Sequence, residues 1–246
     1  MSERQSDRLL RDTVHSELAA LLEAGGPLHV RPAPITLELG GTFIEDIAVA
    51  YRAATPGAPF EGRSAIVTAG PPGAGKSSAA NLIDPAVYRR IDADRIKDRI
   101  LWVLDSQGLL AARHEHTLAD GRPVYPAELA WWVHKASTDA ADLVRQACLA
   151  DGENFLMEGT LAWDRLPAEY VIELVDFDYE SIKIIDIEVP LSVAQTQARE
   201  RWWAGRNESN SAVGGRFISD DAITAFYLIC GKSAPPFTVE VNSLPG

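Results

Sequence analysis

One segment of the chain has the residue types and spacing of a phosphate-binding loop. Residues 70–77 read Gly-Pro-Pro-Gly-Ala-Gly-Lys-Ser and fit the pattern G-x-x-x-x-G-K-[ST] at each fixed position. Glycines let the backbone wrap a phosphate with its N–H groups inward, Lys76 supplies charge for the β- and γ-phosphates, and the Ser77 hydroxyl ligates Mg²⁺. The residues that we expect to bind ATP are Gly70, Pro71, Pro72, Gly73, Ala74, Gly75, Lys76, Ser77 and Ser78.

Two aspartates follow a short apolar segment where a second strand would end. Asp92 and Asp94 stand in Ile-Asp-Ala-Asp, directly before a segment with helical spacing. One carboxylate could hold Mg²⁺-bound water or the local backbone, and the other could take a proton from an acceptor hydroxyl, as the base of a kinase does. The competing interpretation is that both cap the helix, a role that suits aspartate. Because a phosphate-binding loop precedes them, we favour a functional role.

A third carboxylate ends another apolar segment, in Met-Glu-Gly-Thr. If the two strands are neighbours, Glu158 lies beside the loop, where it could bind Mg²⁺ or a substrate hydroxyl. Thr160 offers a further hydroxyl. A solvated strand end is the alternative. No expected strand ends in an aspartate that would complete the magnesium site.

Arginines are concentrated between residues 199 and 216, across a helical segment and a loop rich in Gly, Asn and Ser. Phosphoryl transfer spreads negative charge over three oxygens, which arginines stabilise. We predict that Arg201 and Arg216 form the inner pair, and that a mobile loop at 205–215 closes over ATP and excludes water. Arg199 and Arg206 are expected to be ordinary surface residues.

The overall composition narrows the function classes. The chain has 246 residues, with 23 basic and 35 acidic side chains and a net charge of −12. Such a surface repels a phosphate backbone, so nucleic acid is excluded as the main partner. Two cysteines cannot form a disulfide scaffold, and no apolar run reaches the roughly 18 residues of a membrane span. No guanine-reading Asn-Lys-x-Asp occurs. We expect a cytoplasmic ATP-binding protein without membrane contact.

The elements that must position these residues alternate between strands and helices from residue 63 onward. This alternation predicts an α/β fold of the P-loop kinase type, a parallel sheet flanked by helices, with ligands at the carboxyl ends of the strands. The expected strands are 65–69, 87–91, 155–157, 182–189 and 238–241. The expected helices are 77–83, 94–104, 128–150, 191–204 and 219–230.

Residues 1–62 are predicted to form a mainly helical N-terminal extension to a kinase domain at 63–246. Helical spacing is clear at 1–24 and around 43–51, separated by segments rich in Pro and Gly. The extension could cover the site or pack against the sheet, and we favour packing.

Taken together, these motifs resemble the zeta toxin family, P-loop kinases of bacterial toxin–antitoxin systems. The resemblance rests on the loop at 70–77, Ile-Asp-Ala-Asp-Arg-Ile-Lys at 91–97, Leu-Met-Glu-Gly-Thr at 156–160, Glu-Arg-Trp at 200–202 and Arg216. It covers roughly residues 63–220. The combination is far more specific than any single motif.

The resemblance implies a role for each matching residue. In that family the second aspartate of the Asp-x-Asp pair is the base, which makes Asp94 the base here. The predicted catalytic residues are Lys76, Asp94, Arg201 and Arg216. The predicted substrate-binding residues are Asp94, Asp142, Glu158 and Thr160, and Ser77 is the predicted metal ligand.

The function implied by the resemblance is ATP-dependent phosphorylation of a hydroxyl of a UDP-N-acetylamino sugar, UDP-N-acetylglucosamine in the best-known members, with a small antitoxin as protein partner. An insertion at 105–128, which carries His114 and His116, departs from the family pattern and is expected near the acceptor. The two histidines are expected to lie in a solvated loop. Leu161 stands where an arginine commonly follows. A kinase of an antibiotic, nucleoside or dinucleotide, or a regulatory module that binds ATP without catalysis, remains an alternative.

Overall fold

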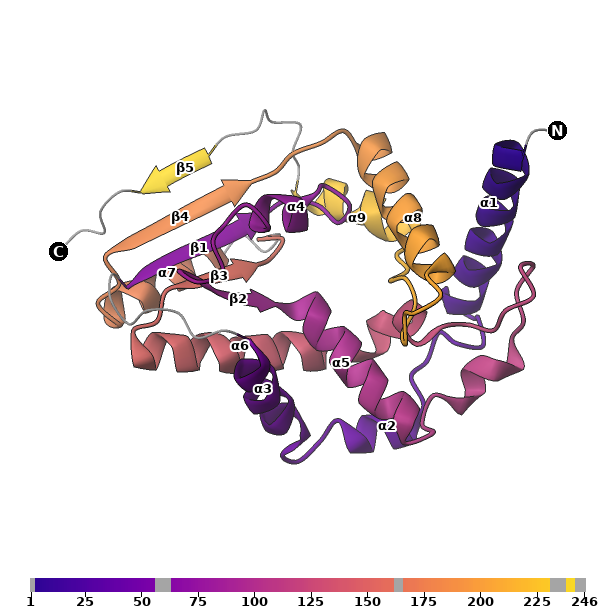
Figure 1. The fold of residues 1–246 in the computed structure, drawn as a ribbon, viewed down its shortest axis with the longest axis horizontal. Coiled ribbons are helices and arrows are strands. Elements are labelled where there is room, and N and C mark those ends of the chain that lie inside the picture. The colour runs from indigo at the N-terminus through magenta and orange to yellow at the C-terminus, as the bar shows by residue number, and fades with distance from the viewer. Residues whose placement is uncertain (1–2, 56–62, 162–165, 231–237, 242–246) are drawn as a thin grey trace.

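A five-stranded sheet forms the centre of the part that the structure describes (Figure 1). This computed structural model describes residues 3–55, 63–161, 166–230 and 238–241. The strand order is β2-β3-β1-β4-β5. The strands are β1 (Ser64–Ala69), β2 (Arg89–Asp92), β3 (Phe155–Glu158), β4 (Ser181–Asp186) and β5 (Thr238–Val241). The first four are parallel, and β5 runs antiparallel to β4.

The register of the strands brings the predicted site residues to one edge of the sheet. Glu158 is the register partner of Thr68 in β1 and of Asp92 in β2. The loop that follows β1 therefore lies beside both carboxylates, as the sequence predicts. β4 ends at Asp186, opposite Ala69. The expectation that this strand continues to residue 189 was therefore wrong. The expectation that no strand ends in an aspartate that completes the magnesium site stays a prediction.

The hydrophobic core follows the two-residue alternation of the strands. Ala65 and Val67 face a large buried cluster, whereas Ile66 faces a smaller one that includes Ala80. The large cluster receives side chains from several helices, including those that pack on this face. These helices are α3 (Phe43–Ala54), α5 (Ala93–Ser106), α6 (His134–Asp151) and α7 (Leu166–Asp176). The short α4 (Lys76–Ala80) packs on the opposite face.

One expected helix is divided in the structure, and another helix was not expected. The helix predicted at 128–150 is split into a 3-10 helix, η2 (Pro126–Val133), and α6. Helix α7 was missed, because its apolar side chains surround the helix: Tyr170 and Leu174 are buried, while Ile172 and Val175 are exposed. No clear apolar stripe marks such a segment. The remaining helices are α1 (Glu3–Leu22), α2 (Ala33–Glu38), η1 (Ala111–Glu115), α8 (Leu191–Asn207) and α9 (Asp220–Cys230).

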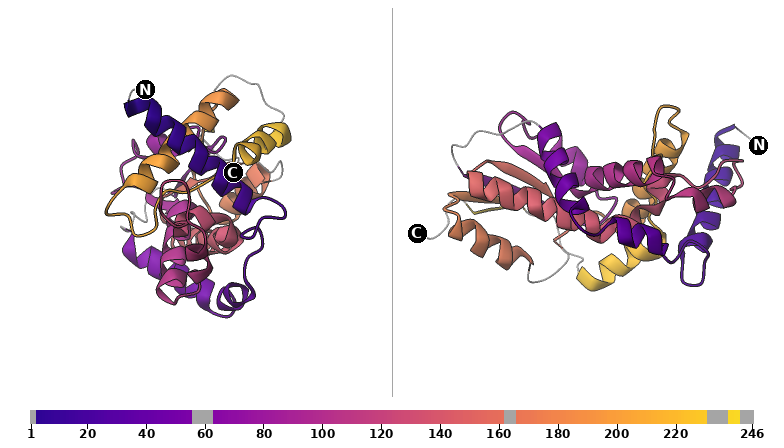
Figure 2. Two further views of the ribbon diagram at one scale, coloured as in Figure 1. Left: turned by 90° about the vertical axis from the view of Figure 1, so that its right-hand side faces the viewer. Right: turned by 90° about the horizontal axis from the view of Figure 1, so that it is seen from below.

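The N-terminal segment packs against the rest of the chain. Figures 1 and 2 show α1 beside α8, at the end of the molecule opposite β5. The described polar contacts of α1 with later residues include Trp203 Nε1 to Asp7 at 3.1 Å and the Ala119 N–H to Glu17 at 2.7 Å. Val14 in α1 belongs to the same buried cluster as the sheet. Packing is thus the role that these contacts favour. Residues 56–62, which precede the expected domain boundary, lie outside the described residues. None of the described helices is long and apolar enough to cross a membrane.

Helix α3 stabilises the end of β2 through one hydroxyl group. The Tyr51 hydroxyl donates to the Arg90 carbonyl at 3.2 Å and accepts the Asp92 N–H at 3.0 Å. Tyr51→Phe leaves two buried backbone groups without this partner, so we expect the free energy of unfolding to fall by about 1–3 kcal/mol in urea titrations. Tyr88→Phe is the control, because the Ser64 hydroxyl that contacts Tyr88 keeps Ser181 as a second partner. Equal losses in both variants would contradict the assignment.

Candidate active site

The predicted phosphate-binding loop connects β1 to α4 and is fixed by close backbone packing. Gly70, Gly73 and Gly75 all have positive φ angles, of 126°, 85° and 95°. A Cβ on Gly70 would overlap the carbonyl oxygen of Ile187, and one on Gly73 would overlap that of Ala194 at the start of α8. Only glycine both adopts these φ angles without strain and leaves room for the neighbouring backbone. The loop is therefore held between the end of β4 and the helix that carries Arg201.

Lys76 folds back over this loop. Its ammonium group donates to the carbonyl oxygens of Gly70 at 2.9 Å and Pro71 at 2.8 Å. The pKa of Lys76 is lowered to about 8, chiefly by burial and also by the charge of Arg201, against the opposite effects of Asp94 and Glu158. A half-buried cation whose described hydrogen bonds go to carbonyl oxygens can exchange these for phosphate oxygens. Its role toward the β- and γ-phosphates stays a prediction.

The lowered pKa of Lys76 gives the site a pH dependence. Below pH 8 the ammonium is charged and attracts phosphate, and above pH 8 the free protein progressively loses this charge. If only the charged form binds, the apparent affinity for Mg·ATP should fall about tenfold between pH 7 and pH 9, measured by equilibrium titration. The Lys76→Arg variant, which stays charged, is the control. A parallel decline in that variant would assign the effect to another group.

Ser77 and Glu158 provide adjacent oxygen atoms beside the loop. The Ser77 hydroxyl donates to Glu158 Oε2 at 2.9 Å, and Arg90 pairs with the other carboxylate oxygen. Burial and the nearby charge of Asp92 raise the pKa of Glu158, against the opposing effect of Arg90. Mg²⁺ commonly binds through one or two protein oxygens together with water and phosphate. The donors present here fit that requirement, and Ser77 as the ligand stays a prediction.

The two aspartates that follow β2 have different surroundings. Asp92 is 6% exposed, and its Oδ1 accepts the backbone N–H groups of Asp94 at 2.9 Å and Arg95 at 3.3 Å. It therefore caps α5. Asp94 contacts cations: Lys97 Nζ lies 3.0 Å from Oδ1, and Arg216 Nε lies 3.4 Å from Oδ2. Capping is thus the observed role of Asp92, and the functional interpretation of Asp94 stays a prediction.

Asp94 is held in its ionised form. Burial raises its pKa, but Lys97, Arg216 and Arg201 outweigh this effect and lower the pKa to about 2. At neutral pH the carboxylate can therefore accept a hydrogen bond from an acceptor hydroxyl without first losing a proton.

The two predicted inner arginines both approach this carboxylate. Arg216 donates to Asp98 Oδ2 at 2.7 Å and to the Asp94 carbonyl at 3.2 Å. Arg201 is exposed, and its charge acts on Lys76, Asp94 and Arg216. The structure thus brings Lys76, Asp94 and both arginines into one electrostatic cluster.

Arg199 and Arg206 are not ordinary surface residues, contrary to the expectation. Arg199 pairs with Asp12 in α1 at 3.2 Å and also with Asp220. Arg206 is 1% exposed and pairs with Asp120 and Glu128 of the insertion. Their partners lie far away in the sequence, and a local pattern cannot reveal such pairs.

Thr160 and Asp142 are less closely connected to the cluster. The Thr160 carbonyl accepts the Gly70 N–H at 3.3 Å, which places this residue beside the loop. Asp142 lies within α6, and its described ion pair is with Arg145 at 3.5 Å. No described contact joins Asp142 to the residues around Asp94, and its role stays a prediction.

Three residues of the cluster were not predicted. Lys97 stands three residues after Asp94 on α5, a spacing that favours ion pairs on a helix, and Asp98 follows it. His134 lies at the start of α6, and its pKa is lowered by burial and by the charge of Lys97, against the effect of Asp94. The i to i+3 spacing of opposite charges was the signal for Lys97, whereas nothing in the sequence marks His134.

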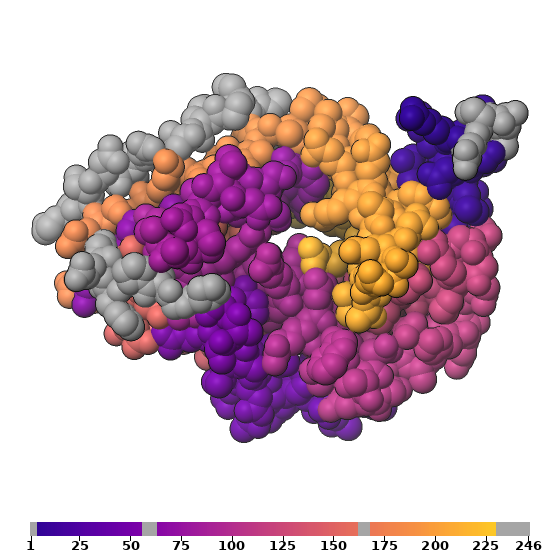
Figure 3. All heavy atoms as spheres, in the orientation of Figure 1, coloured from indigo at the N-terminus to yellow at the C-terminus, as the bar shows by residue number. Residues whose placement is uncertain are grey.

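The arrangement is suited to transfer of a phosphoryl group. In the space-filling view the molecule is hollowed between α5, α8 and the region of the loop (Figure 3). A nucleotide with its phosphates on residues 70–77 would place them among Lys76, Arg201 and Arg216. Positioning and charge stabilisation supply most of what this reaction requires.

Comparisons with known proteins extend this picture. The sequence model of a family described as "Zeta toxin" matches residues 51–241. No curated protein sequence matches the chain significantly. Six chains of solved structures match, including one from the PezAT chromosomal toxin–antitoxin system of the human pathogen Streptococcus pneumoniae. That chain has 15% sequence identity and a TM-score of 0.46, and the match covers 71% of this chain and 65% of that one. This chain thus spans less than two thirds of that solved chain.

Proposed function

Because this chain belongs to the zeta toxin family and has its P-loop kinase fold, we propose that it transfers the γ-phosphoryl group of ATP to a hydroxyl of a UDP-N-acetylamino sugar. UDP-N-acetylglucosamine is the proposed acceptor. The observation that carries the proposal is the placement of Asp94, ionised and half-buried, among Lys97, Arg216 and Arg201, at the same sheet edge as the phosphate-binding loop.

The proposed reaction uses each of these residues in turn. The loop and Lys76 hold the β- and γ-phosphates, with Mg²⁺ bound at Ser77 supplying charge neutralisation. Asp94 accepts the proton of the sugar hydroxyl as the hydroxyl oxygen bonds to the γ-phosphorus. The bond between this phosphorus and the bridging oxygen breaks, and ADP leaves. Arg201 and Arg216 stabilise the negative charge on the transferred group. Glu158 and Thr160, beside the loop, are proposed to bind the sugar, and so is Asp142.

Mass analysis of the products tests this function. Purified protein is incubated with ATP and Mg²⁺, with and without UDP-N-acetylglucosamine, and we expect the sugar nucleotide to gain one phosphate. UDP-glucose, which lacks the N-acetyl group, is the matched acceptor control. Equal transfer to both would remove the specificity for the amino sugar. Binding of Mg·ATP without transfer to either would contradict the proposed acceptor, and a panel of nucleosides and antibiotics would then be tested.

The family relationship also supports a biological role as the toxin of a toxin–antitoxin pair. We propose a small antitoxin as the protein partner, and the cytoplasm as the place of action, because ATP and nucleotide sugars are found there. Co-expression with the product of an adjacent small gene should restore growth of cells that the kinase arrests. Arrest that persists despite a stable complex between the two proteins would contradict this role for that partner.

A further inference from the structure

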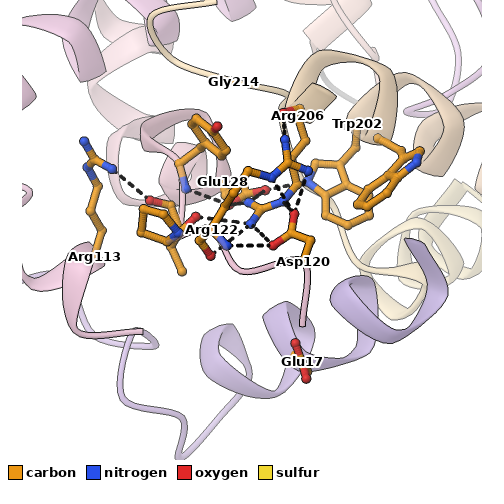
Figure 4. Close-up of polar contacts among 12 residues, drawn as sticks. Glu17, Arg113, Asp120, Arg122, Glu128, Trp202, Arg206 and Gly214 are labelled. Carbon is orange, nitrogen blue, oxygen red and sulfur yellow. Dashed lines mark hydrogen bonds and ion pairs between the residues drawn. The ribbon is translucent and has the colours of Figure 1, made fainter. Parts of the chain in front are cut away.

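A buried polar network joins the insertion at 105–128 to the end of α8 (Figure 4). At its centre lies Arg206, and every nitrogen of its guanidinium donates a hydrogen bond. Nη1 donates to both oxygens of Glu128 at 2.7 Å, and Nε donates to Asp120 Oδ2 at 2.7 Å. Nη2 donates to Asp120 Oδ1 and to the carbonyls of Arg122 and Pro123. One side chain thus fastens the insertion to the helix.

The same network contacts α8 at a second point. Glu128 Oε1 also accepts the indole N–H of Trp202 at 2.8 Å, and Oε2 accepts the Tyr125 N–H at 2.7 Å. Trp202 and Arg206 lie one helical turn apart on α8. A helix held at two points on one face by the same carboxylate is fixed in its rotation about its own axis. The direction of Arg201, the residue next to Trp202, is fixed with it.

The loop that carries Arg216 is held by the same elements. The Ala127 N–H donates to the Val213 carbonyl at 2.8 Å. A Cβ on Gly214 would lie 2.7 Å from the Tyr125 side chain, and one on Gly215 would overlap the Trp202 carbonyl. The loop therefore lies pressed between Tyr125 and α8 immediately before Arg216. The expectation of a mobile loop at 205–215 is not supported by this packing.

The energetic cost of burying charged groups indicates what this network contributes to the protein. Removing charges from water costs several kcal/mol for each ion, so a buried ion-pair network is an inefficient way to stabilise a fold compared with apolar packing. Such networks are better suited to selecting one arrangement of the elements that they join. Here the elements joined are those that carry Arg201 and Arg216.

We propose that Arg206, Glu128 and Asp120 are positioning residues that hold Arg201 and Arg216 in the arrangement needed for phosphoryl transfer before ATP binds. The insertion would then position the arginines that bind the phosphates of ATP, whereas the sequence analysis expected it near the phosphate acceptor. This inference rests on the proposed kinase function for its kinetic consequence, but the rigidity of the loop can be tested without it.

Native-state proteolysis tests the rigidity directly. Trypsin cleaves after arginine, and in the wild-type protein cleavage after Arg216 should be slow because the preceding loop is clamped. In Arg206→Lys, the ammonium group of lysine has fewer donors and cannot reproduce the planar hydrogen-bonding geometry of the guanidinium. Cleavage after Arg216 should therefore become about tenfold faster in this variant. Cleavage of the wild type as fast as that of the variant would overturn the proposal, whether or not the protein shows kinase activity.

Kinetics of the same variant test the positioning. A displacement of about 1 Å can cost 10²-fold in rate, so kcat of Arg206→Lys should fall at least about tenfold per folded molecule. The dissociation constant of Mg·ATP, set mainly by residues 70–77, should change less than about threefold. Arg113→Gln is the matched control, because Arg113 binds Asp105 and the Val124 carbonyl within the insertion and has no described contact with α8.

The remaining outcomes are also decisive. An equal loss of kcat in Arg113→Gln at equal thermal stability would reduce the network to a structural role and overturn the proposal. If Arg206→Lys does not fold, Glu128→Gln replaces it, since Arg206 keeps Asp120 as its charged partner there. A wild-type protein that transfers phosphate to no acceptor would refute the proposed function, while the trypsin result would still decide whether the loop is clamped.

Discussion

Asp94→Asn should lower kcat for phosphoryl transfer by about 10²- to 10⁴-fold, which is the usual contribution of a general base. The amide has nearly the shape of the carboxylate but cannot accept the hydroxyl proton. The affinity for Mg·ATP should change little, because the phosphates are held by the loop at 70–77. Initial rates of product formation, together with equilibrium binding of Mg·ATP, measure the two effects separately.

Asp98→Asn is the control for this prediction. Asp98 stands one helical turn after Asp94 and pairs with the same arginine, Arg216, at 2.7 Å. Both substitutions remove one negative charge from the same cluster, but only Asp94 is placed as the base. A similar loss in both variants would show that the charge balance matters and the base does not. An Asp94→Asn variant with wild-type turnover would refute the assignment of Asp94 as the base. If the protein is an ATP-binding module without catalysis, the wild type itself will show no turnover.

Lys76→Ala should abolish transfer and relieve toxicity in cells. The ammonium lies against the loop that is expected to hold the β- and γ-phosphates, and removing one such donor typically costs 10²- to 10³-fold in kcat. If the chain is the proposed toxin, induced expression of the wild type should arrest growth, and expression of Lys76→Ala at the same protein level should not. Colony counts after induction measure the difference.

The matched substitution for this experiment is Lys135→Ala. Lys135 is exposed on α6 and pairs only with Asp139 in the described part of the chain, so its loss should leave both turnover and toxicity unchanged. Equal toxicity of Lys76→Ala and the wild type would mean that arrest does not depend on phosphoryl transfer. The proposed mechanism of the toxin would then fail even if the enzyme assay succeeds.

The parts of the site that could be predicted from the sequence are those set by local rules. A strand, a glycine-rich turn and a helix in succession define the loop at 70–77, and parallel pairing places the carboxylates that end β2 and β3 beside it. The sequence alone left the roles of Asp92 and Asp94 open. The structure shows that Asp92 caps α5, because it accepts the first backbone N–H groups of that helix, whereas the role of Asp94 as the base stays a proposal.

The parts that could not be predicted depend on contacts between distant segments. In the sequence, Arg206 looks like any arginine near the end of a helix. Its partners Asp120 and Glu128 lie 86 and 78 residues earlier, and only the folded chain brings them into contact with it. The same holds for the loop before Arg216, whose Gly and Ser content suggests mobility. Its glycines in fact permit close packing against Tyr125 and Trp202.

The sheet order has a consequence for how the protein is made. β1, which leads into the loop at 70–77, lies between β3 and β4, and a hydrogen bond from Ser64 reaches Asn154 across 90 residues. Arg199 reaches Asp12 across 187 residues. A chain that emerges from the ribosome in order cannot pair β1 on one side until β3 exists, or on both sides until β4 exists, and contacts of such long range form slowly. Chains that have been synthesised only as far as a residue before Arg216 therefore lack an assembled site.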